Sequence, residues 1–415
     1  MTKSKLSLMS IIALSGACIS FYIGAGFATM QEVVQYDASY GSMFPVVILV
    51  TAIIYIYTNL SFATNGNRLG LERGGEIYRV YCSCFGDKFG KYASIFFDIF
   101  SAFFCYMSFV VMCGGANSTL TQQWGLPKGT GAVGLTILVV CTVIFGLDGI
   151  LNALSKIGPL IIVMILIIAG ITAVTGWPDF MGNMASIDAG NYTDVMQQVG
   201  GGNPLKSGAS YGGFVILWFA AFLAEIGAKN KLKEVNIGML LSALFIFGAS
   251  TICCIALIGH INITAGADIP ALELANQIAP WLAQVFAIII CAGIYTSAVP
   301  LLWTGVRRIS KENSVRYKIV TIAGGVIGCN IGVDIVSFVA SSIVFRLGSI
   351  WALILPINLD FCSLFSFAIC RLCFNFFTWR ICLNNRVAKN NNPAANMADN
   401  THSAMIIIRF VVILS

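Results

Sequence analysis

Long apolar runs recur along the whole chain, and they constrain its fold more than any other feature. A bilayer core of roughly 30 Å needs about 20 apolar residues per helix, and the runs reach this length ten times in 415 residues. With 58% hydrophobic and only 10% charged residues, a soluble domain could not bury this much apolar surface. The sequence predicts an all-α polytopic membrane protein of about ten transmembrane helices, with spans at 6-36, 43-64, 90-117, 131-147, 151-175, 209-229, 235-260, 281-309, 317-332 and 334-357.

Basic residues indicate the orientation of these spans. If the N-terminus is cytoplasmic, most lysines and arginines between spans are cytoplasmic too, whereas the outer loops contain only Lys128 and Lys206. This asymmetry follows the positive-inside rule and predicts a multi-pass protein of the cell membrane with a cytoplasmic N-terminus. The basic clusters flank spans and carry no interleaved aromatic residues, which excludes a nucleic-acid surface. With two histidines in the chain, we expect no zinc site and no cofactor other than a coupling ion.

The order of the spans predicts an inverted repeat. A polar outer segment, 176-206, separates five spans from five more, and an odd number per half reverses the orientation of the second half. We therefore expect a single transporter domain over 1-357, with halves at about 6-175 and 209-357. The sequence also predicts an amphipathic cytoplasmic helix within 70-90 and a short external helix within 267-280.

The C-terminal tail, 358-415, differs from the rest of the chain. All 41 glycines occur at or before Gly348. Cysteine, asparagine and arginine become frequent after that point. Our hypothesis is that the tail is out of register with the ancestral reading frame or has degenerated.

The first span contains a feature that a simple membrane anchor would lack. Ile23 is followed by Gly24, Ala25 and Gly26 about midway along the run, and glycine is a poor helix former. Backbone groups released by a break at this depth must find partners in protein, water or ligand. Released amides attract an anion and released carbonyls a cation, which suits an amino acid carboxylate beside a sodium ion. The alternative is that the small residues only let helices pack closely.

The stretch IGAGFATMQE, from Ile23 to Glu32, resembles the signature of the bacterial YkvI-like membrane proteins. These are described as amino acid permeases of the amino acid, polyamine and organocation superfamily, which shares the leucine-transporter fold. The resemblance covers roughly residues 5 to 345 and implies a 5+5 inverted repeat and an amino acid-like substrate. A weaker likeness to sodium-dependent symporters lies in ALSKIGPLII, from Ala153 to Ile162, and in Gly293 to Ser297.

These resemblances imply particular site residues. The implied sodium ligands are the carbonyls of Ser20, Ile23 and Gly293 with the hydroxyls of Thr296 and Ser297, a set of oxygens that suits a hard cation. Alternatively, both hydroxyls bond back to their own helix. By position in the related symporters, the substrate would contact Tyr106, Trp218 and Phe219, although aromatic residues in spans more often serve packing. The sixth span has no central glycine, which places a second helix break in doubt.

Three charged residues within or near spans are candidates for coupling or gating. Glu32 follows the glycines, and ionisable groups in spans usually face a pathway. Its alternative is a buried, hydrogen-bonded carboxyl. For Glu225 we favour an interfacial charge paired with Lys229 at helical spacing. Lys156 could replace a sodium ion if it reached the first and eighth helices, but snorkelling to the surface is the simpler interpretation.

Together these features predict a secondary active transporter. It would move an amino acid or similar small zwitterion by alternating access, coupled to sodium or protons. The alternative is a membrane nutrient receptor of the same fold that binds a ligand without transporting it. An enzyme is not expected, because no paired carboxylates, Ser-His-Asp set or metal motif converge in the spans. The sequence does not indicate the oligomeric state.

Overall fold

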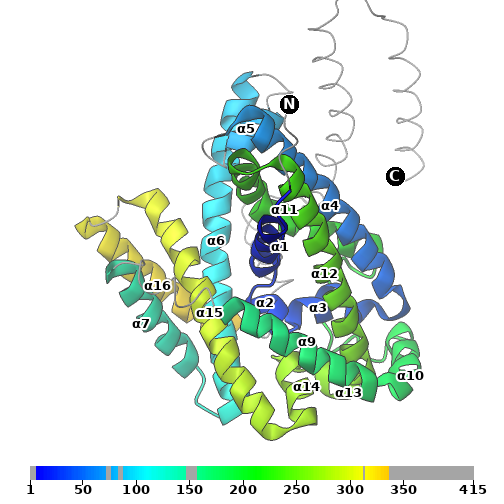
Figure 1. Cartoon of the computed structure of the whole chain (residues 1–415). Coiled ribbons are helices and arrows are strands. Elements are labelled where there is room, and N and C mark those ends of the chain that lie inside the picture. The colour runs from blue at the N-terminus through cyan, green and yellow to red at the C-terminus, as the bar shows by residue number, and fades with distance from the viewer. Residues whose placement is uncertain (1–5, 72–75, 83–86, 146–156, 312–313, 336–415) are drawn as a thin grey trace, which may run out of the picture. The chain divides into compact units, whose positions relative to one another are not determined.

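The computed structural model describes residues 6–71, 76–82, 87–145, 157–311 and 314–335, which belong to one compact unit (Figure 1). Every regular element in these ranges is a helix. The predicted tenth span, the tail and Lys156 lie outside the described residues, and the 5+5 repeat stays a prediction.

Each of the first nine predicted spans coincides with helical structure. The first is divided into α1 (Leu8–Tyr22), α2 (Ala25–Ala28) and α3 (Gln31–Tyr36), and a short 3-10 helix, η1 (Ala38–Met43), follows. In Figure 1, the chain turns away from the direction of α1 as it enters α2 and α3. The other spans correspond to α4 (Phe44–Leu69), α6 (Asp87–Trp124), α7 (Thr130–Phe145), α9 (Ile157–Thr175), α11 (Pro204–Lys229), α12 (Leu232–Gly259), α15 (Pro280–Ile309) and α16 (Val315–Ile335).

The lengths and compositions of these helices define a multi-pass membrane protein. Within the described ranges, segments of α4, α6, α12 and α15 are long and apolar enough to cross a bilayer, and α9 with α10 forms a fifth candidate bent by 88°. Large apolar side chains are exposed along these helices, including Leu49, Ile53, Leu244 and Ile288. An apolar surface of this kind is stable against lipid and not against water.

The short helices lie where the sequence predicts them. α5 (Glu76–Cys82) buries Ile77 and Tyr81 on one face, which confirms the amphipathic helix. α14 (Pro270–Ile278) begins at a proline that fits the first turn, as predicted for the external helix. The remaining short elements are α10 (Trp177–Asp188) and α13 (Ile261–Thr264).

The pair α4 and α11 is the most extensive helix contact in the described chain. Two glycines allow it. A Cβ on Gly66 would overlap the backbone of Ala224, and a Cβ on Gly227 would overlap the backbone of Ala63. Small residues therefore bring the two backbones into direct contact, as is common between membrane helices.

The three pieces of the first span pack against different neighbours. α1 lies along α12, whereas α2 contacts α6, α9 and α15. α3 contacts η1, α11, α12 and α14. The interruption of the first span is therefore at the meeting point of helices from both halves of the described chain.

Candidate functional site

The predicted interruption of the first helix is present at Ile23 and Gly24. α1 ends at Tyr22, and Ile23 leaves the helical region with φ −79° and ψ 79°. The Gly24 amide then donates to the Tyr22 carbonyl at 2.9 Å, and the Ala28 amide donates to the Gly24 carbonyl at 3.0 Å. In a continuous helix, the Ser20 carbonyl would accept from Gly24 and the Ile23 carbonyl from Phe27. Neither bond occurs among the backbone hydrogen bonds of the described residues.

A second interruption follows at Met30. Its φ of 60° makes it the one non-glycine residue with positive φ in the described chain, and L-residues adopt this conformation at an energetic cost. The Thr29 hydroxyl donates to the Gly26 carbonyl at 2.9 Å. The Thr29 carbonyl accepts from the Ala271 amide of α14 at 3.1 Å. α14 thus holds the end of α2 through this bond.

Glu32 folds back onto the glycine segment. A Cβ on Gly26 would overlap the Glu32 carboxyl group, so this glycine makes room for the carboxyl. The Tyr211 hydroxyl of α11 donates to Glu32 Oε2 at 3.2 Å. Glu32 is partly exposed. The structure therefore brings Glu32 together with the predicted substrate residue Gly26, and adds Tyr211, which the sequence alone did not indicate.

Aromatic rings surround the end of α1. Tyr22 lies 5.7 Å from Tyr55 and 6.3 Å from Phe219, measured between ring centroids, and Phe247 is 6.1 Å from Tyr22. Phe219 is 1% exposed, so it packs within this aromatic cluster next to the break. The neighbouring Trp218 belongs to the continuous helix α11, but its side chain is outside the described part of the structure, as is that of Ala25. α11 has no break, as the absence of a central glycine indicated.

Asp37 is a second buried carboxyl close to the break, and the sequence alone did not single it out. It is 1% exposed and lies just after α3. Tyr36, the residue before it, stacks on Tyr211, which donates to Glu32. The only sign of Asp37 in the sequence was its position: it is an acidic residue five positions after Glu32, immediately beyond an apolar run. This position follows the end of the predicted first span, where an acidic residue is ordinarily expected to face water.

The predicted sodium ligands of the eighth span lie on α15, which contacts α2. The Thr296 hydroxyl donates to the Gly293 carbonyl at 2.7 Å, as the alternative interpretation expected. A hydroxyl that donates in this way retains lone pairs for a cation. The Gly293 carbonyl already accepts this bond in addition to its helical one. Of the five proposed ligands, it therefore has the least remaining capacity to bind a cation. Ser297 is partly exposed, and Ser20 is exposed on α1.

Tyr106 lies on α6 and contacts α16. Its hydroxyl donates to the Gly324 carbonyl of α16 at 2.9 Å, and its ring borders the positions of Gly305, Gly324 and Gly328. Its described neighbours are therefore on α15 and α16, where it fills the space that the glycines leave.

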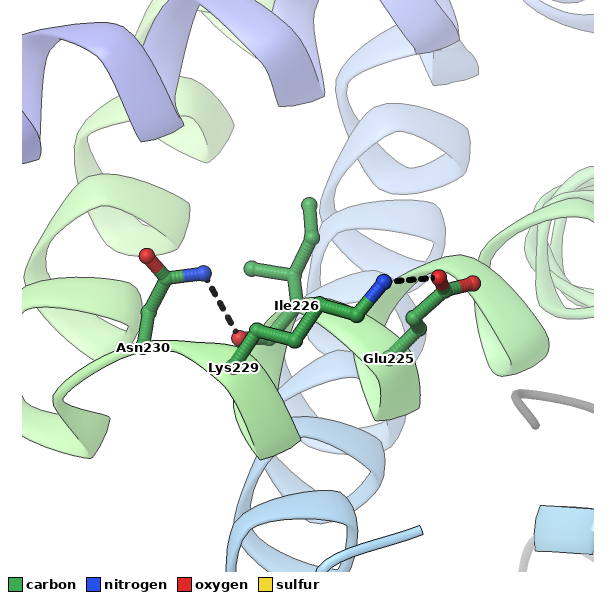
Figure 2. A network of polar contacts seen from close by, with 4 residues as sticks. All are labelled: Glu225, Ile226, Lys229 and Asn230. Atoms are coloured by element: carbon green, nitrogen blue, oxygen red, sulfur yellow. Dashed lines mark hydrogen bonds and ion pairs between the residues drawn. The ribbon is translucent and has the colours of Figure 1, made fainter. Parts of the chain in front are cut away.

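Glu225 forms an ion pair with Lys229 one helical turn away, and Asn230 caps the same helix end through the Ile226 carbonyl (Figure 2). The two charged side chains are 46% and 66% exposed. Exposed pairs of this spacing contribute about 0.3–0.5 kcal/mol. We expect Glu225→Gln to leave transport unchanged and to lower stability by no more than this amount, as measured by uptake and by thermal unfolding. A large loss of uptake would contradict this surface role.

Comparisons with known proteins give limited information about this chain. No protein-family model matches it, and no curated protein matches it. The solved structures similar to this chain include two mutants of a manganese transporter of Eremococcus coleocola. The mutant with a histidine replaced by alanine has a TM-score of 0.49 and 12% sequence identity. The mutant with a glutamate replaced by alanine has a TM-score of 0.43 and 13% sequence identity. Each comparison covers 99% of this chain and 94% of the other. The resemblance to YkvI-like proteins thus continues to rest on the residues that suggested it.

Proposed function

We propose that this chain is a secondary active transporter for an amino acid or similar small zwitterion, coupled to sodium or protons. The observation that carries the proposal is the break at Ile23 and Gly24 in the first membrane helix. A helix that only anchors a protein gains nothing from losing two hydrogen bonds in an apolar medium. The released backbone groups and the nearby Glu32 carboxyl instead form a polar site that a charged ligand could occupy.

The polarity of the break suits a zwitterion with a cation beside it. The carbonyls of Ser20 and Ile23 lack their helical amide partners, and carbonyl oxygens are ligands for a hard cation. On the other side of the break, Ala25 and Gly26 begin α2, where the first amides of a helix have no internal acceptor. These amides would bind a substrate carboxylate, and Glu32 lies within reach of a substrate ammonium group bound against Gly26.

Uptake measurements test this function directly. The full chain is reconstituted in proteoliposomes and supplied with a panel of labelled amino acids under an imposed sodium or proton gradient. We expect saturable, concentrative uptake of at least one of them. Saturable binding without flux would favour a nutrient receptor over a transporter. Neither binding nor flux across the panel would contradict the proposal.

The sodium component has its own test. We expect the double variant Thr296→Ala and Ser297→Ala to lose the stimulation of uptake by a sodium gradient, because both hydroxyl ligands are removed. A matched control is Thr321→Ala, whose hydroxyl also bonds back to its own helix, to the Tyr317 carbonyl at 2.8 Å, but on α16. Sodium dependence that persists in the double variant would refute this ion site.

A further inference from the structure

Asp37 is a buried carboxyl group with no ordinary structural role. It lies where α3 ends and η1 begins, a position at which aspartate usually accepts amide hydrogen bonds as a helix cap. Asp37 makes no such side-chain bond to η1. Its Oδ1 atom is buried and has no hydrogen-bond partner in the described part of the chain, although buried polar atoms are nearly always satisfied. A role in capping therefore does not explain why this carboxyl is buried.

Glu32 and Asp37 share a region without a compensating positive charge among the described residues. Tyr211 donates to Glu32 and stacks on Tyr36, the residue before Asp37, with 4.4 Å between ring centroids. The ion pairs formed by the described residues, Lys229 with Glu225 and Lys231 with Glu234, involve neither carboxyl. Two ionised carboxylates buried together without a cation are strongly unfavourable. A proton taken up from solution would remove one of the two negative charges.

A buried hydroxyl is the second observation at this place. Tyr211 is 2% exposed, and its hydroxyl donates to Glu32 Oε2 at 3.2 Å. Tyr22 is 9% exposed and packs beside Tyr211, with 6.0 Å between the ring centroids. A phenol hydroxyl can donate to an ionised carboxylate or accept from a protonated carboxyl group. Tyr211 can therefore stay hydrogen-bonded to Glu32 in either protonation state.

We propose that Glu32 and Asp37 together bind one exchangeable proton, and that its movement is coupled to uptake. This inference rests on the proposed transport function and extends it to Asp37. Binding adds H⁺ to a carboxylate oxygen and yields a neutral carboxyl group; release breaks the same O–H bond and returns H⁺ to water, with no other bond changed. Glu32 is partly exposed and Asp37 is buried, so Glu32 is the member that exchanges the proton with water.

A proton suits this pair better than a metal ion. No group of three or more His, Cys, Asp or Glu side chains could hold a metal within the ranges that the structure describes. Sodium bound at the α15 site would be separate from the pair. The titratable groups that face the pair are all neutral when protonated: Tyr22 of α1, Tyr36 of α3, Tyr211 of α11, and Cys253 and Cys254 of α12.

Tyr40 and Glu273 also lie on elements packed against α3, but they direct their polar atoms elsewhere. On η1, Tyr40 donates to the Val199 and Asn203 carbonyls. On α14, Glu273 accepts from Gln122 at 2.8 Å.

Infrared difference spectroscopy of the purified full chain tests proton binding without requiring transport. Spectra at two pH values are subtracted, and we expect a carboxylic acid band that is lost in Asp37→Asn and in Glu32→Gln. The matched controls Asp179→Asn and Glu225→Gln remove carboxyl groups away from the pair and should leave this band in place. A band of unchanged amplitude in both buried-site variants would overturn the proposal. Disappearance of the band when sodium replaces choline would also overturn it, because the pair would then bind sodium.

Uptake under a proton gradient gives the second measurement. We expect Asp37→Asn to reduce the stimulation by a proton gradient by about tenfold or more, within the usual range of coupling between ligands, and Asp37→Glu to retain part of it. If Asp37→Asn showed the same uptake and the same proton coupling as the wild type, this inference would be refuted and the proposed transport function would stand. Absence of any uptake by the wild type would refute the proposed function, whereas the infrared result would still decide proton binding. Thermal unfolding identifies a variant that fails to fold.

Discussion

Replacing Gly26 by alanine is expected to reduce gradient-driven uptake by roughly 5- to 150-fold, the range of ordinary coupling between sites. The new methyl group would overlap the Glu32 carboxyl group. Because Glu32 is flexible, the protein can still fold, but the carboxyl must move away from the break and from the Tyr211 hydroxyl. The measurement is uptake of the amino acid that the panel identifies, with thermal unfolding to show that the fold is kept.

Gly24 provides the matched control for this prediction. It lies in the same break, but a Cβ placed there meets no atom within 4 Å, so Gly24→Ala changes the backbone of the break without adding an overlap, and we expect a smaller loss of uptake than Gly26→Ala causes. A double-mutant cycle separates the overlap of the new methyl group with Glu32 from its effect on the backbone of the break. In a Glu32→Ala background the overlap is gone, and Gly26→Ala should cause no additional loss. Equal losses in the two single glycine variants would show that the break needs glycine for its backbone and not for the space beside Glu32.

The crossing of α4 and α11 is expected to tolerate no added volume. Alanine at Gly66 or Gly227 would overlap the backbone of the facing helix, and backbone cannot rotate aside as a side chain can. Overpacking of this kind costs about 1–3 kcal/mol per site. We expect either variant to lower the Tm of the detergent-solubilised protein by several degrees, measured by circular dichroism.

A helical glycine with open space beside it is the control for this stability prediction. Gly134 lies in α7, and a Cβ added there would meet no atom within 4 Å. Here alanine should be neutral or stabilise the helix by up to about 1 kcal/mol. If Gly66→Ala and Gly227→Ala were as stable as Gly134→Ala, the two helices could not be as close as the structure places them.

The break itself was predictable because its cause is local. Two glycines within four residues weaken a helix wherever they occur, and Ile23 and Gly24 do leave the helical conformation. Apolar periodicity and caps likewise located α5 and α14. In each case the deciding interactions connect residues that are close in sequence.

The partners of the acidic residues were not predictable, because they depend on packing between distant segments. Tyr211 reaches Glu32 across 179 positions of sequence, and no local pattern identifies a tyrosine that will face a carboxyl on another helix. Aspartate is usually a surface residue, and its sequence position gave no sign of burial. Asp37 follows α3, which packs against α11, α12 and α14. The Tyr106 hydroxyl likewise donates to the carbonyl of Gly324, which is 218 positions away in the sequence.

The two sides of the break pack mainly against different helices. α1 is held by α12, whereas α2 is held by α6, α9 and α15. Between them, the carbonyls of Ser20 and Ile23 have no helical amide to lose, so α1 can tilt against α2 without breaking a hydrogen bond at those two carbonyls. A cation bound by those carbonyls would stiffen this joint, and its release would free it. Occupancy of the ion site and the angle of the first helix are then two aspects of one equilibrium.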